Sequence, residues 1–284
     1  MSGQFGQIVF IIWRESVEAL LVVGILHAWL ARQTDPVTAT TGRRYLWLGV
    51  LAGIGLALAL AAVLLFFAEN LPESAQEYFM TAMVLIAAGL ILQMVFWLRR
   101  HARSMKQELE AGLDKAAAQA RHWSLFILAM LAVAREGSET VVFLYGILAA
   151  GAYSLAPTLV AIVIGFGTAV FTYWLLQFGS KHLSWRLFFR ATEIMLLLLA
   201  CSLIMNGADH LYGLGIIPSL GGTVWDSSFL LDDGTTFGGL ISALTGYRSR
   251  PDVLSILVFA AYWILVLWRL SRARAAVLPD PKVA

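Results

Sequence analysis

The chain is dominated by long, continuous apolar runs, without the regular alternation of apolar and polar positions that marks half-buried strands. A helix needs about 20 residues to cross the hydrocarbon core of a bilayer. Apolar runs of that length lie at 6–30, 45–68, 78–98, 122–150, 156–178, 187–213 and 253–270. The pattern therefore predicts an all-α membrane protein with seven transmembrane helices, organised as one transmembrane domain over residues 1–284.

The composition supports this fold class and excludes several functions. The chain is 60% hydrophobic and 13% charged, which is more apolar than soluble domains are. Its single cysteine, Cys201, lies among leucines, so it predicts neither a disulfide nor a cysteine metal site within one chain. We find no nucleophile paired with a base, no phosphate-binding loop and no nucleic-acid motif, so we expect neither an enzyme nor a nucleic-acid-binding protein.

The distribution of basic residues predicts the orientation. Most of the 20 Lys and Arg residues lie in the first, third and fifth connections and at the C-terminal end. Because cytoplasmic connections carry the excess of positive charge, the N-terminus is expected outside and the C-terminus in the cytoplasm. The connection 99–121 is rich in Ala and charge, and we expect it to be partly helical along the membrane surface, where its basic residues would meet anionic lipid.

Two apolar runs contain ionisable residues that lipid disfavours. The stretches "RESVE" at 14–18 and "REGSE" at 135–139 each supply one arginine and two glutamates, namely Arg14, Glu15, Glu18, Arg135, Glu136 and Glu139. On a helix the two glutamates share a face, and the arginine stands four residues before the second glutamate, a spacing that favours an ion pair. A charge at the bilayer centre costs about 2.5–3.5 kcal/mol. Each motif keeps one negative charge in excess, which a proton or a multivalent cation would neutralise.

The motif also indicates an internal repeat. Each copy opens a block of three apolar runs, so a second block of three must cross the membrane in the opposite sense. We expect inverted repeats over about 6–98 and 122–213, with 253–270 as an accessory helix. Both motifs would then approach the midplane, where transporters of this plan bind their substrate.

Four facing carboxylates offer only hard oxygen ligands, which suit ferric iron, Mg, Ca or Mn better than copper(I) or thiolate-bound zinc. Two other interpretations use the same residues. The carboxylates would serve as a relay in a proton or monovalent-cation antiporter, or the ion pairs would only fix helix packing in a membrane scaffold.

The sequence resembles the high-affinity iron permease family, also called oxidase-dependent iron transporters. The resemblance rests on the two motifs in the first and fourth runs, on seven runs in all, and on "NGADHLYGLGIIP" at 206–218 closing the sixth. It implies that Glu15, Glu18, Glu136 and Glu139 bind iron, with Arg14 and Arg135 as their partners. It further implies Fe³⁺ as the transported ion, a periplasmic ferroxidase or iron-delivery protein as partner, and a bacterial inner membrane as location. Some relatives are assigned to lead uptake, and no residue here excludes lead.

Further polar residues are candidates for a cation path to the two motifs. The family often has His-Glu and a further Glu at the end of the sixth run, where this chain has Asp209, His210 and Gly213, and the fungal outer-loop motif D-A-S-E is absent. Candidates for the path are Asp209, His210, Glu193, Asp232 and Asp233. For Glu193 an interfacial ion pair with Arg190 is the competing interpretation, and for Asp232 and Asp233 a solvated turn is. The oligomeric state stays open.

Overall fold

The computed structural model describes residues 2–32, 36–101, 122–151, 154–178, 185–218 and 221–275. Within these ranges the helices are α1 Ser2–Ala31, α2 Pro36–Glu69, α3 Glu73–His101, α5 His122–Ala149, α6 Leu155–Phe178, α7 Trp185–Gly213, α8 Thr236–Thr245 and α9 Val253–Ala275. The described chain has one isolated β-bridge, between Thr223 and Asp252, and no strand. Each predicted apolar run lies within one long helix, except that the run 122–150 extends one residue beyond the end of α5. Beyond His101, the predicted surface helix in 99–121 lies outside the described residues.

Five of these helices, α2, α3, α6, α7 and α9, are long and apolar enough to cross a membrane. Helices α1 and α5 have comparable lengths of 30 and 28 residues, and each carries the three charged residues of one motif. The chain is therefore a multi-pass membrane protein.

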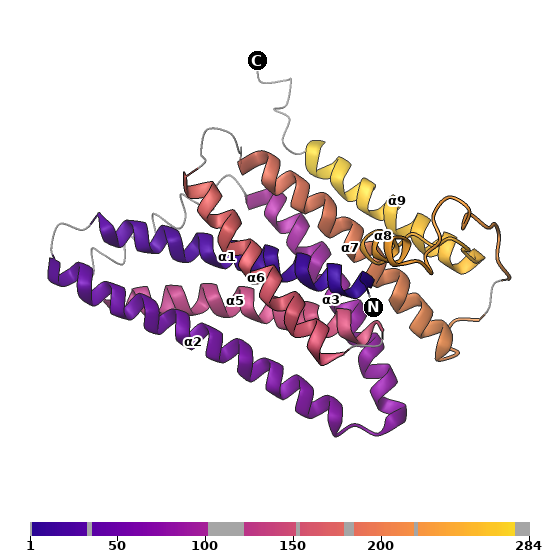
Figure 1. Ribbon diagram of the computed structural model, residues 1–284, viewed down its shortest axis with the longest axis horizontal. Coiled ribbons are helices and arrows are strands. Elements are labelled where there is room, and N and C mark those ends of the chain that lie inside the picture. The colour runs from indigo at the N-terminus through magenta and orange to yellow at the C-terminus, as the bar shows by residue number, and fades with distance from the viewer. Residues whose placement is uncertain are drawn as a thin grey trace, which may run out of the picture.

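Helices α1, α3, α5 and α7 supply most of the buried core, while α2, α6 and α9 lie toward the outside (Figure 1). Helix α7 is the most buried of the five apolar spans, with 61% of its apolar window inside the protein, and α2 the least, with 11%. The most extensive helix pairs are α2 with α5 and α1 with α6. Consequently each helix that carries a motif is held along its length by one peripheral helix.

Small residues let α2 and α5 approach closely. A Cβ atom on Gly49 would lie 2.4 Å from the Phe126 carbonyl oxygen of α5, and one on Gly53 would lie 2.9 Å from the Met130 carbonyl oxygen. One turn further, Ala57 faces Gly137, where a Cβ would meet the Ala57 Cβ at 2.6 Å. These positions repeat every four residues, the arrangement by which small residues pack transmembrane helices. Gly137, inside the second motif, thus serves helix packing.

Helix α8 is an addition that the sequence did not reveal. It is a ten-residue apolar helix in the connection between α7 and α9, and it packs against α1 and α7. The Thr235 side chain caps its first turn, and Gly246 ends it with a φ of 74°, in the left-handed region that favours glycine. A helix of this length is too short to cross a bilayer.

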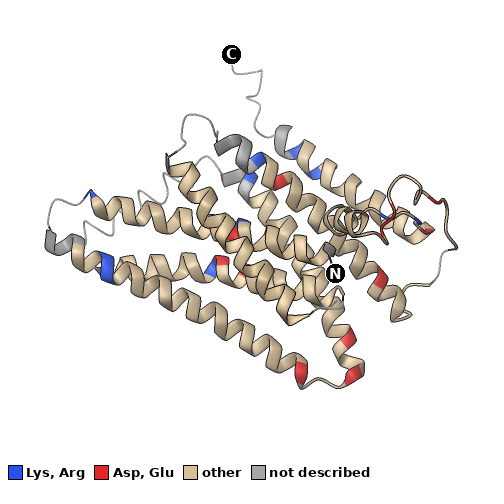
Figure 2. Ribbon diagram, in the orientation of Figure 1, with Lys and Arg blue, Asp and Glu red and all other residues tan. Residues whose placement is uncertain are grey.

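Charged residues segregate along the molecule. Figure 2 shows most Lys and Arg at one end of the long helices and most Asp and Glu at the opposite end, apart from charged residues midway along α1 and α5. This is the separation from which the orientation was inferred, and the orientation itself stays a prediction.

The α2–α5 contact generates a test of the fold. Gly53→Leu should force the two helices apart, because its side chain would meet α5 backbone atoms, and overpacking costs about 1–3 kcal/mol or more. Gly55→Leu is the matched control, since a Cβ on Gly55 has nothing within 4 Å. Thermal unfolding in detergent should show a lower midpoint for Gly53→Leu alone. Equal midpoints for the two variants would contradict the described packing.

Candidate metal centre

The packing of α1 against α5 brings the two motifs together inside the helix bundle. Glu15 and Glu18 of α1 and Glu136 of α5 each offer one carboxylate oxygen, and the three oxygens lie within 4.8 Å of one another. Glu139 is near enough to interact electrostatically with Glu15 and Glu18. Residues far apart in the sequence therefore form one acidic cluster, as the two motif copies predicted.

In the first motif the arginine forms close ion pairs with both glutamates of the same motif. The Arg14 Nη1 atom lies 2.6 Å from Glu15 Oε1, and its Nη2 atom lies 2.5 Å from Glu18 Oε1, at the expected four-residue spacing. Arg14 is 1% exposed, and its Nη1 also donates to the Met94 sulfur of α3 at 2.9 Å. One fully buried guanidinium thus neutralises one of the two α1 carboxylates.

The second motif is more open. The Arg135 Nε atom lies 3.1 Å from Glu139 Oε1 and 3.9 Å from Glu136 Oε1, and the Arg135 side chain is 44% exposed. Its guanidinium carbon lies 4.7 Å from the centre of the Trp97 ring on α3. Both arginines therefore touch α3, at positions one turn apart.

Three carboxylate oxygens of the cluster are buried without a hydrogen-bond donor among the described residues. They are Oε2 of Glu15, Oε2 of Glu136 and Oε2 of Glu139. A buried polar atom without a partner costs about 1–3 kcal/mol, and more for a charged group. Carboxylates of both helices thus keep buried oxygens that could act as ligands to a cation.

The cluster combines four carboxylates with two guanidiniums, so it carries two negative charges in excess when all groups are ionised. Inside an apolar helix bundle such a surplus favours either proton uptake or cation binding. Because the cluster offers oxygen donors, it suits a hard multivalent cation better than a soft one.

Two candidate path residues are engaged in ion pairs at opposite ends of α7. Glu193 pairs with Arg99 of α3, whereas Arg190, the neighbour considered from the sequence, is exposed. Asp209 pairs with Arg248, in the segment after α8. The structure therefore joins α7 to α3 at one end and to the α8–α9 connection at the other, and it places neither acid in the three-oxygen cluster.

The remaining candidates belong to the connection around α8. Asp232 accepts a hydrogen bond from the Gly234 amide, and Asp233 accepts from the amide and hydroxyl of Ser249. Partial burial raises the pKa of Asp233, but the Ser249 hydrogen bonds outweigh it and lower that pKa below its ordinary value. His210 is half-buried near the end of α7. Both aspartates thus help to shape the turn, as the competing interpretation had it.

A polar cavity of about 910 Å³ lies under α8, lined by residues that include Gln7, Ser202, Asn206, Asp233 and Arg248. The buried Gln7 amide donates to the Ala243 carbonyl of α8 and to the Ser202 hydroxyl. Gln7 shares a face of α1 with the fully buried Ile11 and then Glu15. None of the four motif glutamates is among the described residues that line this cavity, and the buried Ile11 lies between Gln7 and Glu15 along α1.

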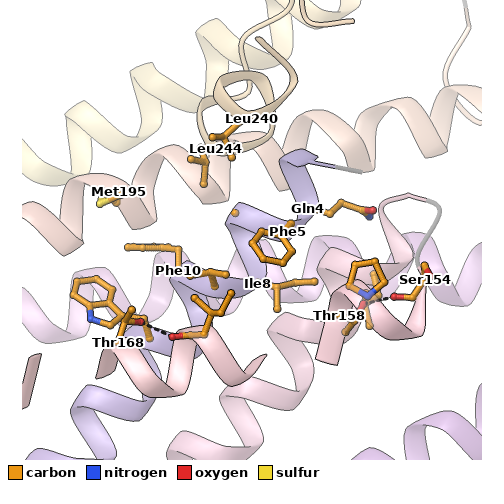
Figure 3. Close-up of a pocket in the computed structure, with 16 residues that line it drawn as sticks. Gln4, Phe5, Ile8, Phe10, Ser154, Thr158, Thr168, Met195, Leu240 and Leu244 are labelled. Atoms are coloured by element: carbon orange, nitrogen blue, oxygen red, sulfur yellow. Dashed lines mark hydrogen bonds between the residues drawn. The ribbon is translucent and has the colours of Figure 1, made fainter. Parts of the chain in front are cut away.

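A second cavity of about 910 Å³, between α1, α6, α7 and α8, is apolar. Gln4 and Ser154 lie toward one end, and Thr168 and Met195 toward the other (Figure 3). None of the described residues that line it is acidic, so they offer a metal ion no charged ligand.

Comparison with known proteins gives the class and then the family. Long apolar helices around a buried carboxylate cluster define a polytopic membrane protein with an acidic interior site. The family model described as "Iron permease FTR1 family" matches residues 6–275, and the chain belongs to this family. It is a family of permeases and not of enzymes.

Several curated relatives carry the name ferrous iron permease EfeU, and two of them illustrate the similarity. The one from Escherichia coli O6:H1 is 32% identical over 263 residues, covering 90% of this chain and 92% of its own. The one from Yersinia pestis is 26% identical over 280 residues, covering 96% and 97%. No solved structure matches the chain.

Sequence reasoning missed Met94 and Trp97, which contact the two arginines from α3. Their spacing of three residues places them on one helix face, but both are residue types that apolar helices commonly contain. Only the packing of α3 against α1 and α5 gives them a partner, so no local signal could have identified them.

The different settings of the two arginines predict different effects on stability. Arg14→Gln should lower the free energy of unfolding by about 3–5 kcal/mol, because it strands two buried carboxylates. Arg135→Gln should lower it by less than Arg14→Gln does, since its ion pairs are longer and its side chain is partly exposed. Unfolding by SDS in mixed micelles, with a chelator present, measures both. A larger loss for Arg135→Gln would contradict this description of the site.

Proposed function

We propose that this protein imports iron across the bacterial inner membrane through the cluster formed by Glu15, Glu18, Glu136 and Glu139. The observation that carries the proposal is the set of buried, unpartnered carboxylate oxygens contributed by both motif helices. Membership of an iron permease family supports iron as the cargo. In this proposal the cation replaces the missing hydrogen-bond donors and neutralises the surplus negative charge.

We further propose seven membrane spans arranged as two inverted repeats, α1–α3 and α5–α7, with α9 as the accessory span and the N-terminus outside. The pairing of helices supports this plan. If α5 corresponds to α1 and α6 to α2, the α2–α5 contact corresponds to the α6–α1 contact, and these two are the most extensive pairs. The crossing of the two motif helices, α1 and α5, would then lie on the pseudo-symmetry axis.

Iron is proposed to occupy the site in the ferric state, because all four glutamates are hard oxygen donors. The relatives' printed names speak of ferrous iron. Ferrous iron supplied outside and oxidised before entry would reconcile the two. A periplasmic ferroxidase or iron-delivery protein is accordingly proposed as partner.

Two alternatives use the same carboxylates. A lead permease would need only the same oxygen cluster, and a proton or cation antiporter would need only its ionisable groups. The antiporter requires sodium or proton exchange that is independent of iron, so it can be separated by experiment.

Uptake of radiolabelled iron into liposomes containing the purified chain tests the proposal, with ferric complex or with ferrous iron plus an added ferroxidase. Glu18→Gln and Glu139→Gln should each reduce uptake by about tenfold or more, because each removes a ligand charge from the cluster. Glu69→Gln, at an exposed end of α2, is the control and should retain uptake.

Unlabelled lead in excess should compete only if it shares the site. The proposal fails if both glutamine variants take up iron at the wild-type rate, or if they lose only an iron-independent dissipation of a proton or sodium gradient.

A further inference from the structure

The two arginines of the cluster are held by different means. Arg14 is enclosed by its own two glutamates and is 1% exposed. Arg135 is 44% exposed, and it approaches Glu136 no closer than 3.9 Å. The spacing of arginine and glutamates is the same in both motifs, but the surroundings of the two arginines differ.

The two arginines meet different side chains of α3. There the Met94 sulfur accepts from Arg14, while the indole ring of Trp97, three residues on, faces the Arg135 guanidinium at 4.7 Å. A guanidinium within about 6 Å of an indole centroid is attracted by the negative face of the ring. The guanidinium thus contacts the Trp97 ring and Glu139 Oε1 together, while Glu136 Oε1 stays 3.9 Å from its Nε atom.

This arrangement has a consequence for the carboxylates. With Arg135 held against Trp97, Glu136 Oε2 and Glu139 Oε2 remain buried without a donor among the described residues. A guanidinium released from the ring would move onto these two carboxylates, since it forms paired hydrogen bonds with carboxylate oxygens. A metal ion would then have to displace it before binding.

We infer that Trp97 is a positioning residue: it holds the face of the Arg135 guanidinium so that this group bonds only Glu139 Oε1, and Glu136 and the second oxygen of Glu139 stay available to the transported cation. The inference rests on the proposed function for the identity of that cation. It predicts that Trp97 acts on metal binding only through Arg135.

A double-mutant cycle in the full-length chain tests this dependence. The variants are Trp97→Leu, Arg135→Gln and the two combined, with Trp97→Phe as the conservative change. Trp268→Leu is the matched control, because it removes an indole that lies 4.0 Å from the Arg272 guanidinium on α9. Two quantities are measured in nanodiscs: equilibrium binding of radiolabelled ferric nitrilotriacetate, and the thermal midpoint of the metal-free protein.

Trp97→Leu should weaken iron binding by about three- to tenfold, and Trp97→Phe by less, following the strength of the ring contact. In the Arg135→Gln background the same substitution should change binding by less than about twofold, and Trp268→Leu should leave binding unchanged in the wild-type background. Thermal midpoints should show coupling between Trp97 and Arg135 whether or not iron binds.

Equal weakening of binding by Trp97→Leu in both backgrounds would overturn the inference, as would the absence of thermal coupling. A wild-type chain that binds no iron would instead overturn the proposed function, while the thermal cycle would still decide whether Trp97 holds Arg135. The two failures are therefore distinguishable.

Discussion

The main constraint on this structure is that an apolar helix bundle holds more negative than positive charge. Four glutamates face two arginines in a region built otherwise from apolar side chains. Such a surplus persists in a folded membrane protein only if a proton or a metal ion can satisfy it. The buried oxygens without donors among the described residues come from both motif helices, and the proposed function places the cation at them.

The surrounding helices keep these charges together. Small residues on α2 bring its backbone against α5, and Gly165 of α6 similarly approaches Ile12 of α1. Rigid contacts on the outer side of each motif helix leave the facing side free to form the cluster. Along α1, the fully buried Ile11 lies between Glu15 of the cluster and Gln7, which lines the polar cavity under α8. Ion pairs near the two ends of α7 join this helix to α3 and to the connection after α8.

Much of this arrangement could be predicted from the sequence, because helix length and apolar character are local properties. The two motif copies also indicated that Glu15, Glu18 and Glu136 would meet. Contacts between segments far apart in the sequence could not be predicted. Glu193 pairs with Arg99 and not with the neighbouring Arg190, and Trp97 of α3 contacts Arg135 of α5. Helix α8 was not predicted because a mostly apolar stretch of ten residues is too short to indicate a span.

The most direct measurement of the central claim is the number of iron ions bound per chain when the glutamates of one helix are changed. A single shared site predicts one ion per wild-type chain, and essentially none after Glu136→Gln with Glu139→Gln, although α1 keeps both of its glutamates. Half of the wild-type stoichiometry in that variant would mean that each helix binds its own ion, and would contradict the account.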